Sequence, residues 1–185
     1  MAQAGLMPDL HHVEGGPMPS MTCRVVTTQQ ELDDALRVRW VVFGGEMRLM
    51  AGQEFPTQRE VNGFDKLSST VHLVVYVEHG PVATVRILLP NPEVASATGG
   101  VLGVEMEHRL DLTGLVEPGQ VVAEAARFCV HRQWRHSDAV VLLQAAFYAE
   151  SRRRGVTTGL PGRIWRRTRR WMRASSSRPL PTTAG

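Results

Sequence analysis

The chain has 185 residues, which is long enough for one domain with its own core, and 43% of them are hydrophobic. It contains no apolar run of about 18 residues, so no transmembrane segment is expected, and its N-terminus lacks the features of a signal peptide. Two cysteines are too few for a disulfide framework, so a cytoplasmic protein is expected.

The net charge of +3 conceals a strong segregation of charge along the chain. Residues 152–185 contain ten arginines and no acidic residue, so this segment carries +10 and the remainder, by difference, carries −7. A basic tail of this kind binds acidic partners, nucleic acid or anionic lipid electrostatically. We do not expect nucleic acid to be the main partner.

The first predicted element after an aperiodic leader is a capped helix. Residues 1–21 are rich in Gly, Pro and Met and are predicted to be disordered. Thr28 to Glu31 form a capping box, in which a hydroxyl N-cap is followed three residues later by a glutamate. The helix is expected to end at Gly44-Gly45. Its apolar stripe consists of Leu32, Leu36, Trp40 and Phe43.

A long loop over residues 46–66 is followed by a predicted β-hairpin. Thr70–Glu78 and Val82–Leu89 alternate as strands around a turn at residues 79–81, and Pro90-Asn91-Pro92 ends the second strand. Residues 93–102 are small and glycine-rich, and Glu105–Leu112 are predicted to be helical.

The segment from Val121 to Val130 is predicted to be a buried strand, although it carries Glu124 and Arg127. A buried charge costs several kcal/mol unless it is paired. The strand therefore holds either a structural ion pair or a working site. Regular alternation places the two side chains on opposite faces, so a direct pair requires a bulge.

A helix capped by Ser137 or Asp138 should follow and run to about Arg154. It is apolar nearly all round through Ala149 and is therefore expected to be buried. Residues 155–158 can begin another strand. Beyond them the chain loses its core periodicity.

This order of elements, with five short motifs, resembles a GNAT-type N-acyltransferase of the branch that contains acyl-homoserine-lactone synthases and long-chain N-acyl amino acid synthases. The motifs are Arg39-x-x-x-Phe43, Glu60-x-Asn62-x-x-Asp65, Thr70-Val71-His72-Leu73, Arg86-Ile87-Leu88-Leu89-Pro90 and Glu124-Ala125-Ala126-Arg127-Phe128. The resemblance implies an α/β (α+β) fold with a mixed central sheet flanked by helices, over residues 22–158. Residues 159–185 form the basic tail, and the C-terminal part of the fold is expected to be missing, either because the reading frame is lost near Thr158 or because the tail is genuine.

Two departures from the family pattern matter. Asn62 stands where the pattern has an aspartate, which puts the role of that carboxylate in doubt. The turn over residues 131–137 has no glycine, whereas common GNAT enzymes bind the coenzyme A pyrophosphate at a glycine-containing turn. This favours an acyl carrier protein over acyl-CoA as the acyl donor.

The resemblance implies transfer of a fatty acyl group from an acyl carrier protein or acyl-CoA thioester to a small-molecule amine, in an amino acid or a homoserine-lactone precursor. Glu124 is the candidate base, with a pKa raised by apolar neighbours and lowered by Arg127 or Arg86. Arg86 and Arg127 are the other two catalytic candidates, which are expected to hold a carboxylate or the geometry of the site. No metal and no permanently bound cofactor are expected. The remaining candidates are Arg39, Phe43, Asp65 and Phe128 for substrate binding, and Arg132, Arg135 and Ser137 for the donor phosphate.

Other interpretations of these residues stay open. Glu124 and Arg127 can be a buried ion pair without a catalytic role, and Arg39, which lies off the apolar stripe, can be a solvated helix residue. At the level of the whole chain, the alternatives are a non-catalytic relative that binds an acyl carrier and a nucleic-acid- or surface-binding protein driven by its tail.

Overall fold

The computed structural model describes residues 20–50 and 56–161. Residues 1–19 of the predicted leader, which was placed at residues 1–21, and the part of the basic tail from residue 162 onward lie outside the described residues. Within the described ranges no helix is both long enough and apolar enough to cross a membrane.

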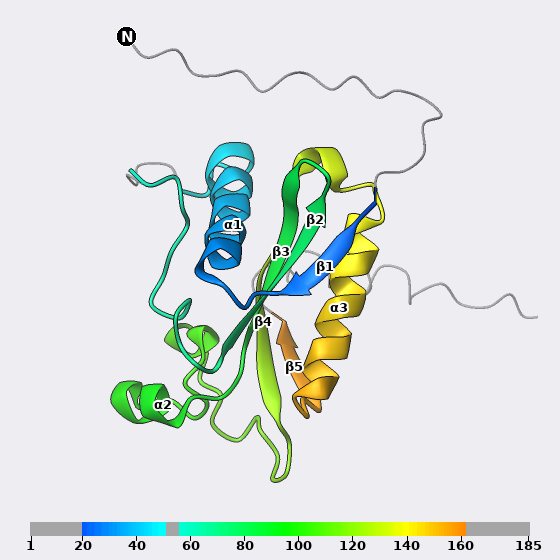
Figure 1. Cartoon of the computed structure of the whole chain (residues 1–185). Coiled ribbons are helices and arrows are strands. Elements are labelled where there is room, and N and C mark those ends of the chain that lie inside the picture. The colour runs from blue at the N-terminus through cyan, green and yellow to red at the C-terminus, as the bar shows by residue number, and fades with distance from the viewer. Residues whose placement is uncertain (1–19, 51–55, 162–185) are drawn as a thin grey trace, which may run out of the picture.

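The core of the molecule is a mixed five-stranded sheet with the strands in chain order (Figure 1). The pairs β1–β2, β2–β3 and β3–β4 are antiparallel, and β5 is parallel to β4. This confirms the predicted GNAT-like α/β fold with a mixed sheet flanked by helices. The strands are β1 (Thr22–Val25), β2 (Thr70–Val77), β3 (Gly80–Leu88), β4 (Val122–Val130) and β5 (Thr158–Pro161).

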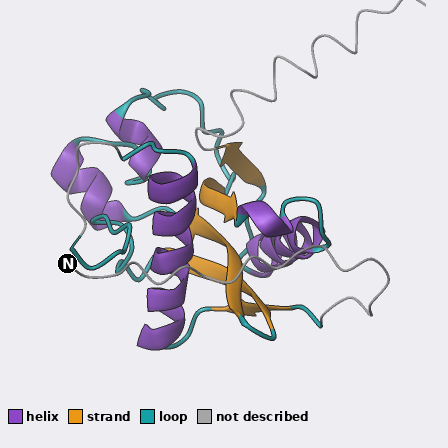
Figure 2. Ribbon diagram, turned by 90° about the horizontal axis from the view of Figure 1, so that it is seen from above, coloured by secondary structure: helices purple, strands orange, loops and turns teal. Residues whose placement is uncertain are grey.

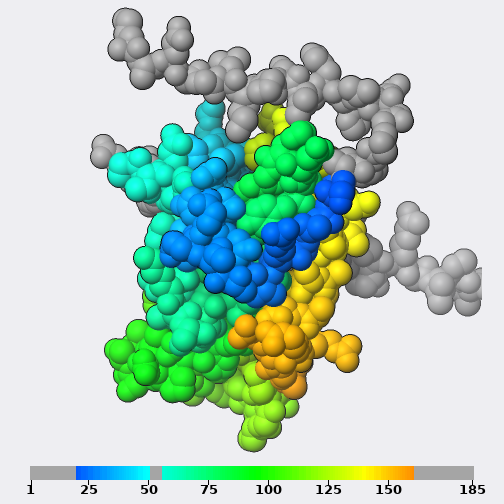
Figure 3. Space-filling model, viewed as in Figure 1, coloured from blue at the N-terminus to red at the C-terminus, as the bar shows by residue number. Residues whose placement is uncertain are grey.

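One face of the sheet packs on α3 (Ala139–Arg153), so that the sheet lies between helices (Figure 2). Alternate residues of the β2–β3 hairpin, including Val71, Leu73 and Ile87, meet Leu143 of α3 in this core. β1 lies at the sheet edge between the hairpin and α3 (Figure 3). A four-residue strand at residues 22–25 was not predicted.

The expectation that α3 is buried nearly all round was wrong. Val141 is 66% exposed and Tyr148 is 52% exposed. The helix covers one face of the sheet, and only the side that meets the strands is buried. Helix α3 begins at Ala139, and its N-terminal cap is Asp138, as one of the two predicted alternatives placed it.

The other face of the sheet is covered by α1 (Gln29–Arg39) and by the π-helical turns of η1 (Trp40–Glu46) that continue it. The predicted capping box is present, since Thr28 Oγ1 accepts a hydrogen bond from the Glu31 N–H at 3.2 Å and the Glu31 carboxylate accepts one from the Thr28 N–H at 3.1 Å. The helical segment runs through Gly44-Gly45 to Glu46. Neither glycine adopts the positive φ that a glycine stop requires.

The connection between β3 and β4 contains α2 (Pro92–Thr98) and one 3₁₀ turn, η2 (Glu105–His108). Helix α2 was not predicted, although Asn91 caps it by accepting from two backbone N–H groups and Pro92 occupies its first turn. The helix expected over residues 105–112 is reduced to η2. The Glu107 carboxylate accepts hydrogen bonds from the backbone N–H groups of residues 101–104 and so fixes this turn.

A β-bulge in β4 sets the direction of Arg127. Between the pairs Thr84↔Cys129 and Arg86↔Ala126, β3 advances two residues while β4 advances three. The extra residue adopts a left-handed conformation, with a φ of 56° at Arg127. The bulge brings Arg127 to the face of the sheet that carries Glu124, whereas regular alternation had placed them on opposite faces.

Strand β5 begins at Thr158, the last residue of the segment 155–158 in which a further strand was expected to start, and it runs three residues past the predicted domain boundary. It is the last strand of the described sheet, and an edge strand tolerates the glycine and proline at residues 159 and 161.

Candidate active site

Three arginines and three carboxylates alternate in a closed ring on the α1 side of the sheet. Each arginine contacts two of the carboxylates, and each carboxylate contacts two of the arginines. In order, the ring consists of Arg39, Asp65, Arg86, Glu105, Arg127 and Glu60, which contacts Arg39 again.

The deep side of the ring is formed by Arg39 from the end of α1 and Asp65 from the loop before β2. Arg39 is fully buried, so it is not a solvated helix residue. Its Nη1 donates to Asp65 Oδ1 at 2.7 Å, and its other donors contact Asp65 and Glu60. Burial alone would raise the pKa of Asp65, but Arg39 and then Arg86 lower it to about 2.

Arg86 of β3 links the deep side of the ring to the loop segments. It is fully buried, donates to Asp65 Oδ1 at 2.6 Å and to Asn62 Oδ1 at 2.7 Å, and also contacts Glu105. Asn62 Nδ2 in turn donates to Glu105 Oε1 at 3.2 Å. Asn62 therefore bridges the ring as a neutral amide, both accepting and donating.

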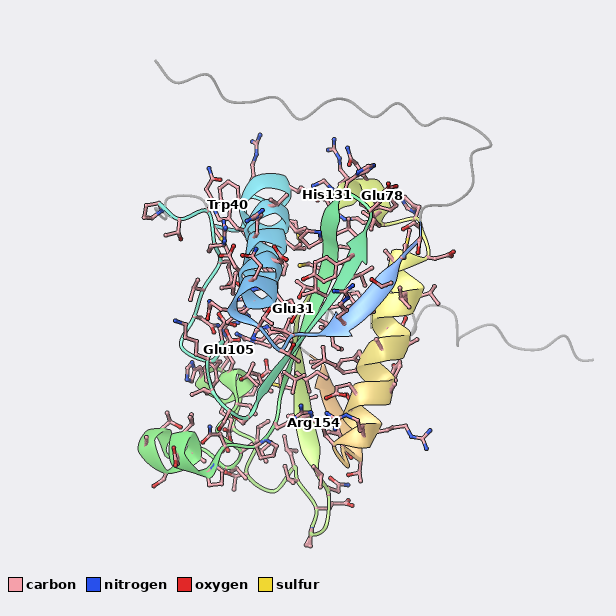
Figure 4. The ribbon with its side chains drawn as sticks, viewed as in Figure 1. Glu31, Trp40, Glu78, Glu105, His131 and Arg154 are labelled. Carbon is pink, nitrogen blue, oxygen red and sulfur yellow. The ribbon has the colours of Figure 1, made fainter. Side chains whose placement is uncertain are left out.

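The ring opens toward solvent at Arg127 and Glu105, whose side chains are 24% and 16% exposed. Two roughly parallel hydrogen bonds join them, from Arg127 Nη1 to Glu105 Oε2 at 3.0 Å and from Nη2 to Oε1 at 2.9 Å. Arg127 Nε donates to Glu60 Oε1 at 3.1 Å. Figure 4 places Glu105 on the side of the sheet that carries α1.

Glu124 lies on β4 beside the ring but is not a member of it. It is 4% exposed, and its Oε2 accepts a hydrogen bond from the backbone N–H of Met106 at 2.8 Å. Among the described residues it makes no ion pair within 4.0 Å, so Glu124 and Arg127 are not the direct pair that was considered. Burial is the main cause that raises the pKa of Glu124, and the negative charge of Glu105 raises it further. The hydrogen bond from the Met106 N–H and the positive charges of Arg86 and Arg127 lower it, and the net effect is a raised pKa.

His72 lies behind the ring and was not expected to take part in it. Its Nε2 is 3.1 Å from the Asp65 carbonyl oxygen, and burial lowers the pKa of its imidazole to about 4. A neutral imidazole therefore packs against Asp65 at neutral pH.

The two aromatic candidates lie on different faces of the sheet. Phe43 is buried in a small cluster with Val38, Val42 and Cys129, one helical turn beyond Arg39. Phe128 follows the bulge and packs against the core under α3. The structure therefore does not bring Phe128 to the face that carries Glu124.

The three candidates for the donor phosphate lie in the turn between β4 and α3, where a carboxylate that the sequence did not single out holds two of them. Glu46 accepts from the Arg132 backbone N–H at 2.9 Å and pairs with the Arg135 guanidinium. Ser137 Oγ donates to the Trp134 carbonyl oxygen at 2.8 Å. The Arg132 side chain is exposed.

The second half of β4 has an open edge. β5 pairs with residues 122–125 only, so within the described chain residues 126–130 have no strand on that side. Among the described residues, the backbone groups of this stretch that face away from β3 therefore have no strand partner, although the Val130 carbonyl oxygen accepts a hydrogen bond from Arg135 Nε at 3.1 Å. A separate hollow of about 470 Å³ is lined by residues 98–101 and 107–113, none of which belongs to the ring.

The fold that carries this ring is that of an acyltransferase domain. The family model for the acetyltransferase (GNAT) domain matches residues 38–145, more than half of the chain, and the protein therefore belongs to this family. Its members use acyl-CoA-type donors. No curated protein matches the chain at a significant level.

Solved structures share the fold at low sequence identity. An acyl-CoA N-acyltransferase from Pseudomonas aeruginosa is 17% identical, with a TM-score of 0.56 over 84% of this chain and 88% of that one. The AHL synthase LasI is 18% identical, with a TM-score of 0.54 over 77% and 72%. The N-acyl amino acid synthase FeeM from uncultured soil microbes is 15% identical, with a TM-score of 0.53 over 77% and 70%.

Proposed function

We propose that this GNAT-family acyltransferase moves a fatty acyl group from a carrier thioester to the amine of an amino acid or a homoserine-lactone precursor. The observation that carries the proposal is Glu124, a buried carboxylate with a raised pKa beside the open edge of β4. A raised pKa makes a carboxylate a stronger proton acceptor, which is what a general base for an ammonium group requires.

The reaction needs one proton acceptor and one set of oxyanion donors. Glu124, directly or through one water, takes the proton of the acceptor ammonium, and the freed amine attacks the thioester carbonyl carbon. Backbone N–H groups on the open edge of β4 stabilise the tetrahedral oxyanion. Collapse of this intermediate breaks the C–S bond, and the leaving thiolate takes up the second proton of the attacking nitrogen, so that an amide and a thiol are formed and Glu124 gives its proton to solvent. Every step uses side chains or backbone groups and needs no covalent enzyme intermediate.

The ring supports an acceptor that carries a carboxylate. Arg127 is the most exposed of the three arginines and stands at the opening of the ring. Its guanidinium can accommodate an acceptor carboxylate next to Glu124, while Arg39 and Arg86 stay engaged in the buried part. Arg39, Asp65 and Phe43 then shape the floor of the acceptor side.

The turn between β4 and α3 supports an acyl carrier protein as the donor. Glu46 partly neutralises this turn, and a pyrophosphate carries more negative charge than the single phosphodiester of a carrier-bound pantetheine. Arg132, whose side chain is exposed, and Arg135 remain the cations that can meet such a phosphate.

The test is thiol release from acyl carrier protein and acyl-CoA thioesters of graded chain length, with and without a panel of amines, followed by mass spectrometry of the products. We expect amine-dependent release that falls about 10²–10⁴-fold in Glu124→Gln. The matched control is Glu78→Gln, an exposed carboxylate at the hairpin turn (Figure 4), which should leave the rate unchanged. Donor binding without thiol release for any amine would refute acyl transfer and favour a non-catalytic acyl-carrier-binding protein.

A further inference from the structure

Glu105 occupies a place in the site that neither the sequence motifs nor the family match assigns. Glu105 belongs to η2, and its side chain is a member of the ring. The next residue, Met106, donates its backbone N–H to Glu124. We propose that Glu105 is a positioning residue for Glu124, and that it supplies the carboxylate that Asn62 lacks. This inference rests on the proposed role of Glu124 as the base.

The geometry couples the two glutamates through one peptide unit. Two arginines on adjacent strands, Arg86 and Arg127, hold the Glu105 side chain. The next residue, Met106, donates its N–H to Glu124 Oε2 at 2.8 Å. Fixing the Glu105 side chain therefore fixes the donor that orients the Glu124 carboxylate.

Asn62 fits this arrangement because it is an amide. Its Oδ1 accepts from Arg86 at 2.7 Å and its Nδ2 donates to Glu105 at 3.2 Å. An aspartate at residue 62 has no N–H to donate and would place a second negative oxygen against Glu105. With Glu105 in the ring, three arginines already face three carboxylates, so a fourth would be in excess. The amide at residue 62 and the carboxylate at residue 105 are thus matched.

Glu105 also acts on Glu124 through its charge. The charged groups that face Glu124 are Arg86 from β3, Arg127 from β4 and Glu105 from η2. Burial is the main cause of the raised pKa of Glu124, and Glu105 raises that pKa further against the two arginines. Removal of the Glu105 charge leaves the arginines less opposed, so Glu124 becomes a weaker base.

The direct test is an NMR titration of the Glu124 side chain in ¹³C-glutamate-labelled protein, assigned with Glu124→Gln. Glutamine keeps the length and one oxygen acceptor of the side chain, so that Met106 stays in place, and in Glu105→Gln we expect the loss of charge alone to move the Glu124 titration down by about one pH unit. The matched control is Glu107→Gln, which loosens the same turn by weakening the acceptor for four backbone N–H groups but removes no charge from the ring. It should move the Glu124 titration by less than about 0.3 pH unit.

Two further variants test the pairing of residues 62 and 105. Asn62→Asp alone should move the Glu124 titration up, because it adds a negative charge beside Glu105. The double variant Asn62→Asp/Glu105→Gln again has three carboxylates facing the three arginines. Its Glu124 titration should therefore lie closer to that of the native chain, with at least half of the downward shift seen in Glu105→Gln reversed. If Glu105→Gln does not fold, Asn62→Asp decides the question, since an unmoved Glu124 titration in that variant overturns the inference.

The acyl-transfer assay separates this inference from the proposed function. The acidic limb of the kcat/KM profile should move to lower pH in Glu105→Gln by the same amount as the NMR titration, and it should not move in Glu107→Gln. Amine-dependent thiol release with an unmoved Glu124 titration in Glu105→Gln refutes the positioning role and leaves acyl transfer standing. A shifted titration without thiol release in the native chain refutes acyl transfer and leaves the coupling of the two glutamates standing.

Discussion

Substitution of Arg39 by methionine tests whether the ring holds the molecule together. Arg39 is fully buried at the junction of α1 and η1, and all three of its nitrogen atoms contact Asp65 or Glu60. Methionine keeps much of the length and the apolar character of the side chain. The variant therefore removes the charge and the donors while it limits the loss of packing.

The magnitude follows from the carboxylates left behind. The pKa of Asp65 is about 2, compared with an ordinary value of 3.8. A shift of this size corresponds to about 2–3 kcal/mol of stability at pH 7. Glu60 loses a partner as well, and removal of one member of a buried ion pair costs about 3–5 kcal/mol. We therefore expect Arg39→Met to lower the free energy of unfolding by about 3–5 kcal/mol at pH 7.

The assay is denaturant unfolding at pH 7 and pH 4, with Arg37→Met as the matched control on the same helix. The Arg37 side chain is 49% exposed and pairs with Asp33 across one turn, so its removal should cost about 0.5 kcal/mol or less. The Asp65 contribution in the native chain is present above pH 3.8 and is lost as the pH falls through about 2. Without Arg39 the buried Asp65 takes up a proton at a higher pH, so the difference between variant and native chain should shrink from pH 7 to pH 4.

A loss of less than about 1 kcal/mol in Arg39→Met at pH 7, equal to that of the exposed control, would refute this reasoning. It would mean that the carboxylates find water or other partners at little cost. A loss of full size that does not change with pH would refute the assignment of the cost to Asp65.

The remaining predictions concern His72 and Glu46. The pKa of His72 is about 4, below its ordinary 6.5, so its neutral form contributes stability that is complete above pH 6.5 and is lost as the pH falls toward 4. This loss is about 3 kcal/mol, and His72→Gln should flatten that part of the unfolding free energy against pH. Glu46→Gln frees Arg135 from its carboxylate and should lower KM for both acyl donors several-fold with little change in kcat. Equal KM values in the two proteins would exclude Arg135 from donor binding.

The central elements of the fold could be predicted because their signals are local. The capping box at Thr28, the alternation of the hairpin and the apolar run of β4 each specify one element within about ten residues of sequence. β1 and α2 have only four and seven residues, which is too short for a periodicity to emerge. The Asn91-Pro92 pair was interpreted as a strand stop, although the same pair is a helix start.

The site was only partly predictable because its contacts join distant segments. The motifs pointed to Arg39, Asp65, Arg86 and Arg127, and the structure brings these four together. Glu105 carries no local signal, since the partners that give it a role lie 19 to 43 residues away. The charge balance of the predicted site would have indicated a further acidic residue, because three buried arginines need three carboxylates to neutralise them.

The bulge in β4 escaped prediction for a different reason. A left-handed conformation is uncommon for a residue with a side chain, and no glycine marks the position. The conformation is held by what Arg127 contacts, Glu60 and Glu105, and not by its own preference. The resemblance had made Phe128 a substrate-binding candidate, and regular alternation would place it on the face of Glu124, but the inserted residue turns it toward α3.

The ring has a consequence for the order in which the chain assembles. Its links join residues separated by 19 to 67 positions, and the longest, between Arg127 and Glu60, closes only when β4 has docked on the hairpin. Contacts of this kind form late, after the local helix and hairpin. Interactions that are absent from the folding transition state govern the unfolding rate and leave the folding rate nearly unchanged. The ring therefore stabilises the native state kinetically: it slows unfolding and has little effect on the rate of folding.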